Sequence, residues 1–516
     1  MVNDHSAESR PRSTRRQALY GWIVFLSSAV VMVLEISAGR LIAPYVGVSL
    51  YSWTSIIGVV LAGLSLGNWA GGHWADRGAD EREVGLALSA AALATLSVLL
   101  TLTVVAPRVQ SGSFGLLTAS FLLAGGLFFV PAACLGAVAP MLTTLALARD
   151  SRAGHVVGRM HALAALGSIL GTFLTGFVLI QYFGTRAVIA GAGVSLLLLA
   201  APLLRRAPAV MAASTMLAAG VFLAGFARQG MSNPCADESQ YYCIRVVESE
   251  GDGAPAGTRT LVLDHLVHGI SYGPDPSLLF APYAHLMDEL IRDHLGERIG
   301  DARFFFAGGG SYSQPRAVVA GLPGARVQVA ELDPAVTRTA RQHLFLDTDT
   351  MMIDHTDARV ALGSAAPGSF DAIIGDVFHD IAVPYHLTTH EYAELVASRL
   401  APGGIYVLNA VDIFPDPRLV KSIVKTLAVS FPRVDVWLHR IPEDRSRATY
   451  VIAAADGVEP PPVMESRFGL ARGWIRVTDP VLETGTPLES LPLLTDDYVP
   501  VERLVSTLLL EGVGNR

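Results

Sequence analysis

The stretch Arg303-Phe-Phe-Phe-Ala-Gly-Gly-Gly310 decides the fold of the C-terminal half of this 516-residue chain. Its first five residues form an apolar run with the length and composition of a buried β-strand. Three glycines follow at once, and bare glycine backbone lets a ligand approach closely. A helix is expected next, and its N-terminus would lie beside that ligand. The stretch therefore predicts a strand–loop–helix unit with a binding site at the end of the strand.

The alternation of strand and helix continues downstream. Strands are expected at Val327-Gln-Val-Ala-Glu331, Phe370-Asp-Ala-Ile-Ile-Gly-Asp376 and Gly404-Ile-Tyr-Val-Leu-Asn409, and a helix is expected at 334–343. This rhythm is typical of a doubly wound parallel sheet. We therefore predict an α/β Rossmann-like doubly wound domain over residues 281–516.

A smaller β-rich segment precedes that domain. Two runs rich in β-branched and aromatic residues, 241–247 and 260–264, flank a turn at 251–257 that contains glycine and proline. Such a pattern indicates antiparallel strands joined by a loop. Residues 235–280 are therefore predicted to form a small antiparallel β subdomain.

The N-terminal half is apolar throughout, and residues 18–230 are predicted to form an α-helical transmembrane bundle behind a basic N-terminal segment at 1–17. A bilayer crossing needs about 20 apolar residues. The stretch at 114–147 is too long for one straight crossing and contains Pro131 and Pro140, so two helices are expected there. The count is then eight helices, with seven as the alternative. The apolar stretches lie near 18–38, 52–72, 84–105, 114–147, 156–182, 186–204 and 208–227.

Small residues recur in this half at the spacing of helix contacts. Gly63 and Gly67 are four residues apart, as are Gly167 and Gly171. Such pairs let helix backbones approach closely, so the helices are expected to pack against one another.

Three carboxylates are expected at the strand ends of the Rossmann-like domain. Glu331 ends the second strand 21 residues after Gly310, where a carboxylate can accept both hydroxyls of a ribose. Asp357 follows at a position that can meet an adenine edge, and Asp376 ends the next strand inside the crevice. A phosphate-binding Gly-x-Gly-x-x-Gly motif is absent after the first strand. The pattern therefore predicts an adenosyl ligand without a pyrophosphate.

Eight motifs of residues 235–510 together resemble those of the spermidine synthases, the polyamine aminopropyltransferases, in their membrane-fused bacterial form. These motifs are Glu238-Ser-Gln-Tyr-Tyr242, Leu263-Asp264, Phe306-Ala-Gly-Gly-Gly310, Glu331-Leu-Asp-Pro334, Asp357-Ala-Arg359, Phe370-Asp-Ala-Ile-Ile-Gly-Asp376, Leu400-Ala-Pro-Gly-Gly404 and Leu494-Thr-Asp-Asp-Tyr-Val-Pro-Val-Glu502.

The resemblance implies decarboxylated S-adenosylmethionine as the donor and an amine or polyamine as the acceptor. Glu331 would hold the ribose of the donor, Asp357 and Ala358 would meet its adenine, and Asp376 would be the general base. The donor site would further be lined by Gly308, Gly309, Gly310 and Ser311. The acceptor-facing residues would be Tyr242, Asp264, His268, Tyr283, His379 and Asp380.

The chain departs from the family pattern where amines would be held. The family has Asp directly after its glycine triplet, where Ser311 stands here. It has Gln at the positions of Tyr242 and His268, and an acidic residue at the position of His379, with Asp380 one step later. The adenosine-facing positions are kept, so the sequence supports the nucleoside more strongly than the polyamine.

The leading hypothesis is a membrane-integrated aminopropyltransferase-like enzyme with no prosthetic group and no metal. A second hypothesis is an enzyme that uses intact S-adenosylmethionine, for methyl transfer or for breakdown without an acceptor. A third is a transporter or sensor with a nucleoside-binding domain. Expected partners are the nucleoside, an amine and the lipid bilayer; no nucleic acid is expected, and a homo-oligomer is possible.

Charge leaves the membrane topology open. Residues 1–230 contain fifteen arginines, no lysine and eight acidic residues. The arginines before residue 17 place the N-terminus in the cytoplasm. Eight crossings return the soluble domain to the cytoplasm but leave the arginines at 149–159 outside, whereas seven crossings export the domain. We expect eight, in an inner cell membrane, because the ligand is a cytosolic metabolite, and we therefore expect Cys235 and Cys243 to be reduced.

Overall fold

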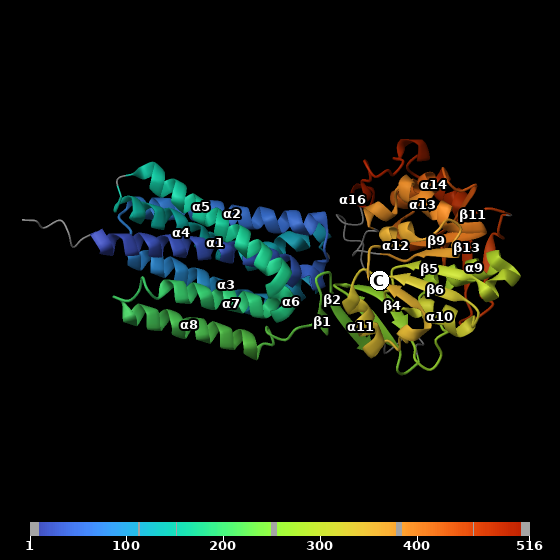
Figure 1. Ribbon diagram of the computed structural model, residues 1–516, viewed down its shortest axis with the longest axis horizontal. Coiled ribbons are helices and arrows are strands. Elements are labelled where there is room, and N and C mark those ends of the chain that lie inside the picture. The colour runs from blue at the N-terminus through green and yellow to red at the C-terminus, as the bar shows by residue number, and fades with distance from the viewer. Residues whose placement is uncertain are drawn as a thin grey trace, which may run out of the picture. The chain divides into compact units, whose positions relative to one another are not determined.

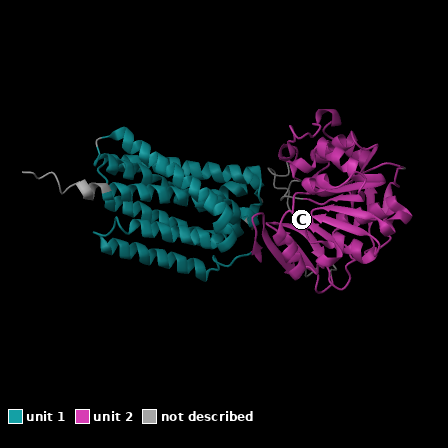
Figure 2. Cartoon of the chain, viewed as in Figure 1, with its two compact units in different colours: residues 1–234 teal, residues 235–516 magenta. Residues whose placement is uncertain are grey.

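The computed structural model describes residues 10–111, 114–150, 152–248, 255–377, 384–457 and 459–506. The chain forms two compact units, residues 1–234 and residues 235–516 (Figure 2). The first unit is helical, and the second combines strands and helices (Figure 1).

The first unit contains seven apolar helical rods within the described residues, and six of them are long and apolar enough to cross a membrane. The seventh, α7, has 16 residues. One rod is continuous from α5 through a π-helical turn at Thr175–Leu179 into α6. The helices are α1 (Arg10–Val46), α2 (Leu50–Asp76), α3 (Glu81–Ser111), α4 (Leu116–Leu147), α5 (Ala153–Leu174), α6 (Ile180–Phe183), α7 (Thr185–Ala200) and α8 (Pro208–Ala227).

Helix α4 corrects one prediction. It is a single 32-residue helix that contains both Pro131 and Pro140, so the expectation of two helices at 114–147 is wrong. The count of eight, which depended on that break, loses its basis. A proline removes one backbone hydrogen bond, and neighbouring helices and Ser/Thr side chains can compensate for the loss in an apolar bundle.

Close backbone contact between α2 and α4 holds α4 along its length. A Cβ atom on Gly67 would lie 2.0 Å from the carbonyl oxygen of Ala133, and one on Gly71 would lie 2.5 Å from that of Ala137. On α5, a Cβ on Gly167 would lie 2.0 Å from the carbonyl oxygen of Phe25 in α1. The predicted close packing through small residues is confirmed, because only glycine fits at these crossings.

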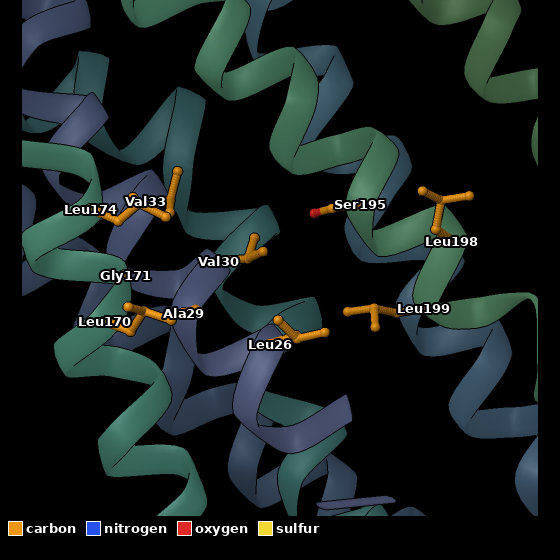
Figure 3. Close-up of a pocket in the computed structure, with 10 residues that line it drawn as sticks. All are labelled: Leu26, Ala29, Val30, Val33, Leu170, Gly171, Leu174, Ser195, Leu198 and Leu199. Carbon is orange, nitrogen blue, oxygen red and sulfur yellow. The ribbon is translucent and has the colours of Figure 1, made fainter. Parts of the chain in front are cut away.

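An apolar groove of about 280 Å³ lies between α1, α5 and α7 (Figure 3). Ser195 contributes the one hydroxyl to its lining, and this hydroxyl donates to the carbonyl of Ala192 at 2.7 Å. The groove therefore presents hydrocarbon and offers no charged group to a polar solute. Its other lining residues are Leu26, Ala29, Val30, Val33, Leu170, Gly171, Leu174, Leu198 and Leu199.

The second unit begins with a four-stranded antiparallel sheet in the order β1-β2-β3-β4. Its strands are β1 (Asp237–Glu238), β2 (Cys243–Glu248), β3 (Arg259–Leu263) and β4 (Leu266–Ser271). Cys235 and Cys243 form a disulfide across the β1–β2 turn, with Cα atoms 5.1 Å apart. The expectation that these two thiols are reduced is therefore contradicted. The reason is local: Glu238 pairs with Cys243, and this register folds the chain back so that the two cysteines meet.

A nine-stranded mixed sheet follows, in the order β12-β13-β10-β11-β9-β8-β5-β6-β7. Strands β5 to β9 are mutually parallel, whereas β9 to β13 pair antiparallel. The predicted doubly wound parallel sheet is thus correct for one half only. The strands are β5 (Arg303–Ala307), β6 (Arg326–Ala330), β7 (Met352–Asp354), β8 (Phe370–Gly375), β9 (Leu400–Phe414), β10 (Arg433–Leu438), β11 (Ser446–Ala455), β12 (Val463–Glu465) and β13 (Gly473–Arg476).

Helices cover the sheet and complete its core. Leu286 and Leu290 of α9 are buried in one cluster with Phe304 and Phe306 of β5. The helices of this unit are α9 (Pro282–Leu295), α10 (Ser313–Gly321), α11 (Pro334–His343), α12 (Ala358–Ser364), α13 (His390–Arg399), α14 (Arg418–Leu427), α15 (Thr478–Glu483) and α16 (Val501–Leu504). Strand order reverses between β5 and β8, and ligands of open α/β sheets bind at such a switch point.

Candidate active site

The glycine loop after β5 lies directly against the end of β8. Gly308 has φ +89°, and a Cβ atom there would lie 2.4 Å from the carbonyl oxygen of Asp376. The amide of Gly308 donates to the carbonyl of Ala330 at 2.9 Å, which ties the loop to the end of β6. Both the backbone conformation and the lack of space therefore require glycine. The loop joins the ends of three parallel strands at the switch point.

The carboxylate of Glu331 holds this loop through hydrogen bonds from its backbone amides. Its Oε2 accepts hydrogen bonds from the amides of Gly309 (2.9 Å) and Gly310 (3.2 Å), and its Oε1 accepts one from the amide of Asp333 (3.0 Å). Burial raises the pKa of Glu331, and these backbone hydrogen bonds oppose part of the rise. The carboxylate is thus fixed beside the glycines, and each oxygen keeps acceptor capacity for a hydroxyl.

Replacing Glu331 with glutamine should weaken binding of S-adenosylmethionine-type nucleosides at least tenfold, about 1.4 kcal/mol. The amide of glutamine must turn its NH₂ group toward a backbone N–H on one side, so both the loop and the ribose contact suffer. Titration calorimetry measures the effect, with Asp349→Asn as a control that removes an exposed carboxylate elsewhere in the unit. Equal affinity of Glu331→Gln and wild type would contradict the ribose assignment.

Asp357 has three partners in the structure. Its Oδ1 caps α12 by accepting from the amides of Arg359 (2.9 Å) and Val360 (3.2 Å), and its Oδ2 lies 2.7 Å from Nε2 of His386. Ala358 is buried as the first residue of that helix. The adenine contact stays a prediction, and an adenine would share Oδ2 with His386. The adjacent Arg359 forms a two-pronged ion pair with Asp496, both contacts 2.7 Å, so two of the sequence motifs meet here.

Asp376 follows β8 between two polar side chains. Asn409 Nδ2 donates to its Oδ1 at 2.9 Å, and the Tyr283 hydroxyl donates to its Oδ2 over a longer 3.4 Å. Burial raises the pKa of Asp376 to about 6, and the two hydrogen bonds oppose part of this shift. Burial also raises the pKa of Tyr283, with the Asp376 carboxylate as the second cause. A carboxylate of this kind is ionised at neutral pH yet basic enough to take up a proton.

Strand β4 of the small sheet closes the glycine loop from the other side. A Cβ atom on Gly269 would lie 2.0 Å from Ser311 Oγ, and the Ser271 hydroxyl donates to the carbonyl of Ser311 at 3.1 Å. Ser311 itself is 2% exposed, and its hydroxyl donates to Ser313 Oγ at 3.2 Å. The position after the glycines is therefore a buried, neutral contact between the two sheets.

The structure shows the surroundings of three further residues that were predicted to face the acceptor. The rings of Tyr242 and His268 are neighbours, with centroids 6.4 Å apart, and the carbonyl of His268 faces Gly310. The Asp264 carboxylate accepts from the amide of Cys243 at 2.9 Å, which gives it a backbone-anchoring role. Substrate contacts of all three residues stay predictions. His379 and Asp380 lie outside the described residues.

Two polar contacts of the site were not assigned from the sequence. Asn409 is 3% exposed and bonds to Asp376, and its Oδ1 has no hydrogen-bond partner among the described residues. The sequence offered one indication of Asn409, a polar residue directly after the apolar run 405–408. His386 gave no such signal, because it lies in a short 3₁₀ turn 29 residues after Asp357. Within the described ranges, no group of three or more His, Cys, Asp or Glu side chains could hold a metal ion.

Comparison with known proteins finds relatives that are described as aminopropyltransferases. No family model matches the chain. A protein of Bifidobacterium longum described as a probable polyamine aminopropyl transferase is 22% identical over an alignment of 227 residues, and the match covers 41% of this chain and 50% of that protein. The chain spans about half the length of the curated relatives it matches.

Similarity to solved structures is also found. A probable spermidine synthase from Corynebacterium glutamicum is 23% identical, and the match covers 46% of this chain and 89% of that one, with a TM-score of 0.40. A spermidine synthase in complex with the transition-state analogue AdoDATO is 19% identical, with 43% and 73% coverage and a TM-score of 0.35.

Proposed function

We propose that this protein is a membrane-integrated transferase that moves an aminopropyl group from decarboxylated S-adenosylmethionine to an amine and releases methylthioadenosine. One observation carries the proposal: Asp376 sits at the switch point beside the glycine loop, between Asn409 and Tyr283, with a pKa raised to about 6. The curated relatives, which are aminopropyltransferases, support the same reaction class.

The reaction needs a neutral amine in line with a carbon of the sulfonium donor. The nitrogen lone pair forms a C–N bond to the aminopropyl methylene, and the C–S bond breaks. Its electron pair stays on sulfur, which becomes the neutral thioether of methylthioadenosine. Amines of this type titrate near 10, so at neutral pH the nitrogen must lose a proton to react. Asp376 accepts that proton, and Asn409 and Tyr283 hold the carboxylate in place.

A second candidate keeps intact S-adenosylmethionine and either transfers its methyl group or breaks it down without an acceptor. Ser311 favours it, because a buried neutral side chain stands where the related enzymes place an acid for the donor's amine. Product analysis separates the two. Purified full-length protein is incubated with decarboxylated or intact S-adenosylmethionine, each with and without putrescine. Methylthioadenosine that forms only with the decarboxylated donor and putrescine supports aminopropyl transfer.

The apolar unit supports membrane integration. Six helices have the length and hydropathy of membrane spans, and glycine contacts between α2 and α4 and between α1 and α5 are of the kind that packs helices in lipid. Extraction of the full chain from cell membranes by detergent, but not by alkaline carbonate, checks this assignment.

The pH dependence follows from Asp376. The pKa of this group is about 6 in the folded protein, so the base is ionised at pH 7 and becomes protonated as the pH falls. We expect kcat/KM for the nucleoside to fall about tenfold per pH unit below pH 6. Steady-state rates between pH 4.5 and 8, at a fixed saturating amine concentration, measure this limb. A limb centred at an ordinary aspartate value near 4 would contradict Asp376 as a desolvated base.

A further inference from the structure

We propose that the catalytic unit, residues 235–516, lies on the non-cytoplasmic side of the membrane, opposite the N-terminus. Three sets of observations carry this inference: the ends at which the helices of the first unit begin and finish, the distribution of arginines between those ends, and the disulfide Cys235–Cys243. The inference goes beyond the proposed activity and does not depend on it.

Side-chain contacts identify one end of the bundle. Glu81, the first residue of α3, forms ion pairs with Arg16 of α1 at 2.6 Å and with Arg149 after α4 at 3.3 Å. Arg159, in the second turn of α5, donates to the carbonyl of Gln17 in α1 at 3.3 Å. The start of α1, the start of α3, the end of α4 and the start of α5 therefore share one end, which we call the basic end.

A single contact identifies the opposite end. Arg186, in the first turn of α7, donates through Nη1 to the carbonyl of Gly230, which follows α8. Helix α7 therefore begins at the end of the bundle where α8 finishes, whatever the length of α7. The continuous rod formed by α5 and α6, Ala153–Phe183, runs from the basic end to the end where α7 begins. Residue 230, and the chain that continues from it, therefore emerges opposite the basic end.

Arginine is distributed unequally between the two ends. Four arginines, Arg40, Arg108, Arg186 and Arg228, fall at the end where the chain leaves the bundle. The other eleven of the fifteen fall at the basic end: Arg10, Arg12, Arg15, Arg16, Arg77, Arg82, Arg149, Arg152, Arg159, Arg205 and Arg206. Positive charge near membrane spans is retained in the cytoplasm, so the basic end is cytoplasmic. Because α4 is one continuous helix, the arginines at 149–159 lie at the same end as the N-terminal arginines. A break in α4 would add a crossing and place them on the non-cytoplasmic side.

The disulfide is an independent observation. Cys235 and Cys243 lie at the beginning of the second unit and are paired, whereas Cys134 in α4 is free. Disulfides persist in oxidising compartments and are rare in the cytosol, where thiols are kept reduced. The pairing therefore agrees with the side given by the helix ends and the arginines.

With the proposed function, the side on which the catalytic unit lies determines how its substrates reach it. A sulfonium nucleoside that is made in the cytoplasm starts on the opposite side of the membrane from this site. It must cross the membrane before it reaches a site on the other side, whereas an amine from outside the cell reaches that site directly. The reaction that supplies the donor must therefore be followed by a transport step.

Cysteine labelling in oriented vesicles tests the side of the domain without any measurement of activity. In the full-length Cys134→Ser background, single cysteines are placed at exposed positions of the two ends, Glu297→Cys in the second unit and Asp76→Cys at the end of α2. We expect a membrane-impermeant maleimide to label Glu297→Cys in right-side-out vesicles and Asp76→Cys in inside-out vesicles only. The reversed pattern, or labelling of Glu297→Cys in both preparations, would overturn the proposal.

Discussion

The Asp376→Asn variant should lose about 10²–10⁴-fold in turnover while it still folds and binds the nucleoside. Asparagine has nearly the same shape as aspartate and keeps one oxygen that can accept from Asn409, but its amide takes up no proton at a useful pH. The measurement is the turnover number at saturating donor and amine, with calorimetry of nucleoside binding on the same samples. A loss of turnover without a loss of nucleoside affinity identifies Asp376 as the base.

Stability provides a second readout for this variant. The folded pKa of Asp376, about 6, is above the unfolded value near 3.9, so the folded state binds this proton more tightly. The contribution that this group makes to stability is therefore greatest at low pH and is lost as the pH rises through about 6. Asparagine removes an ionised, desolvated group at pH 7, so the thermal midpoint of the variant should be equal to or higher than that of the wild type.

Asp371 offers a matched control on the same strand. It lies at the opposite end of β8, where its carboxylate pairs with Arg303 at 2.9 Å. Asp371→Asn should leave turnover within about twofold of wild type and cost at most about 1 kcal/mol of stability, as expected for a half-exposed ion pair. If Asp376→Asn keeps turnover comparable to that of Asp371→Asn, Asp376 is structural. A reaction that needs no deprotonated acceptor would then become the leading hypothesis.

The sequence predicts those residues of the site that directly follow a β-strand. The glycine loop, Glu331 and Asp376 each follow an apolar run directly, and parallel strands bring such ends to one edge of the sheet. Asn409 required knowledge of register: Gly375 pairs with Leu408 across β8 and β9, which makes the next residues of both strands neighbours. No local pattern states which residues of two strands face each other.

The errors in the fold have tertiary causes. Pro131 and Pro140 read as helix breaks on their own, and only the close contact with the glycines of α2 shows why α4 continues through them. The antiparallel half of the sheet arises because β10 is followed by β11 through the short connection at 439–445, with no crossover helix to turn the strand parallel. The disulfide depends in the same way on the pairing of β1 with β2.

A substitution in the glycine loop is also expected to reduce activity strongly. Gly308→Ala should lower kcat/KM for the nucleoside by about 10²-fold or more, since a displacement of about 1 Å in a catalytic site can cost that much. The new methyl group would lie 2.4 Å from the carbonyl oxygen of Asp376 and 3.0 Å from Val377 Cγ1. The loop and the end of β8 must then move apart, and this movement displaces the base from the donor.

Gly257→Ala separates the steric effect from backbone strain. Gly257 has φ +87°, nearly the same as the +89° of Gly308, but an added Cβ there meets nothing within 4 Å. Both variants carry the penalty of about 1–2 kcal/mol for alanine in a left-handed conformation. Only Gly308→Ala has the additional overpacking cost of about 1–3 kcal/mol and the displaced base. Paired measurements of thermal unfolding and kcat/KM should therefore show Gly257→Ala as destabilised but fully active. If Gly308→Ala matches it in activity, the contact between the glycine loop and Asp376 does not position the catalytic group.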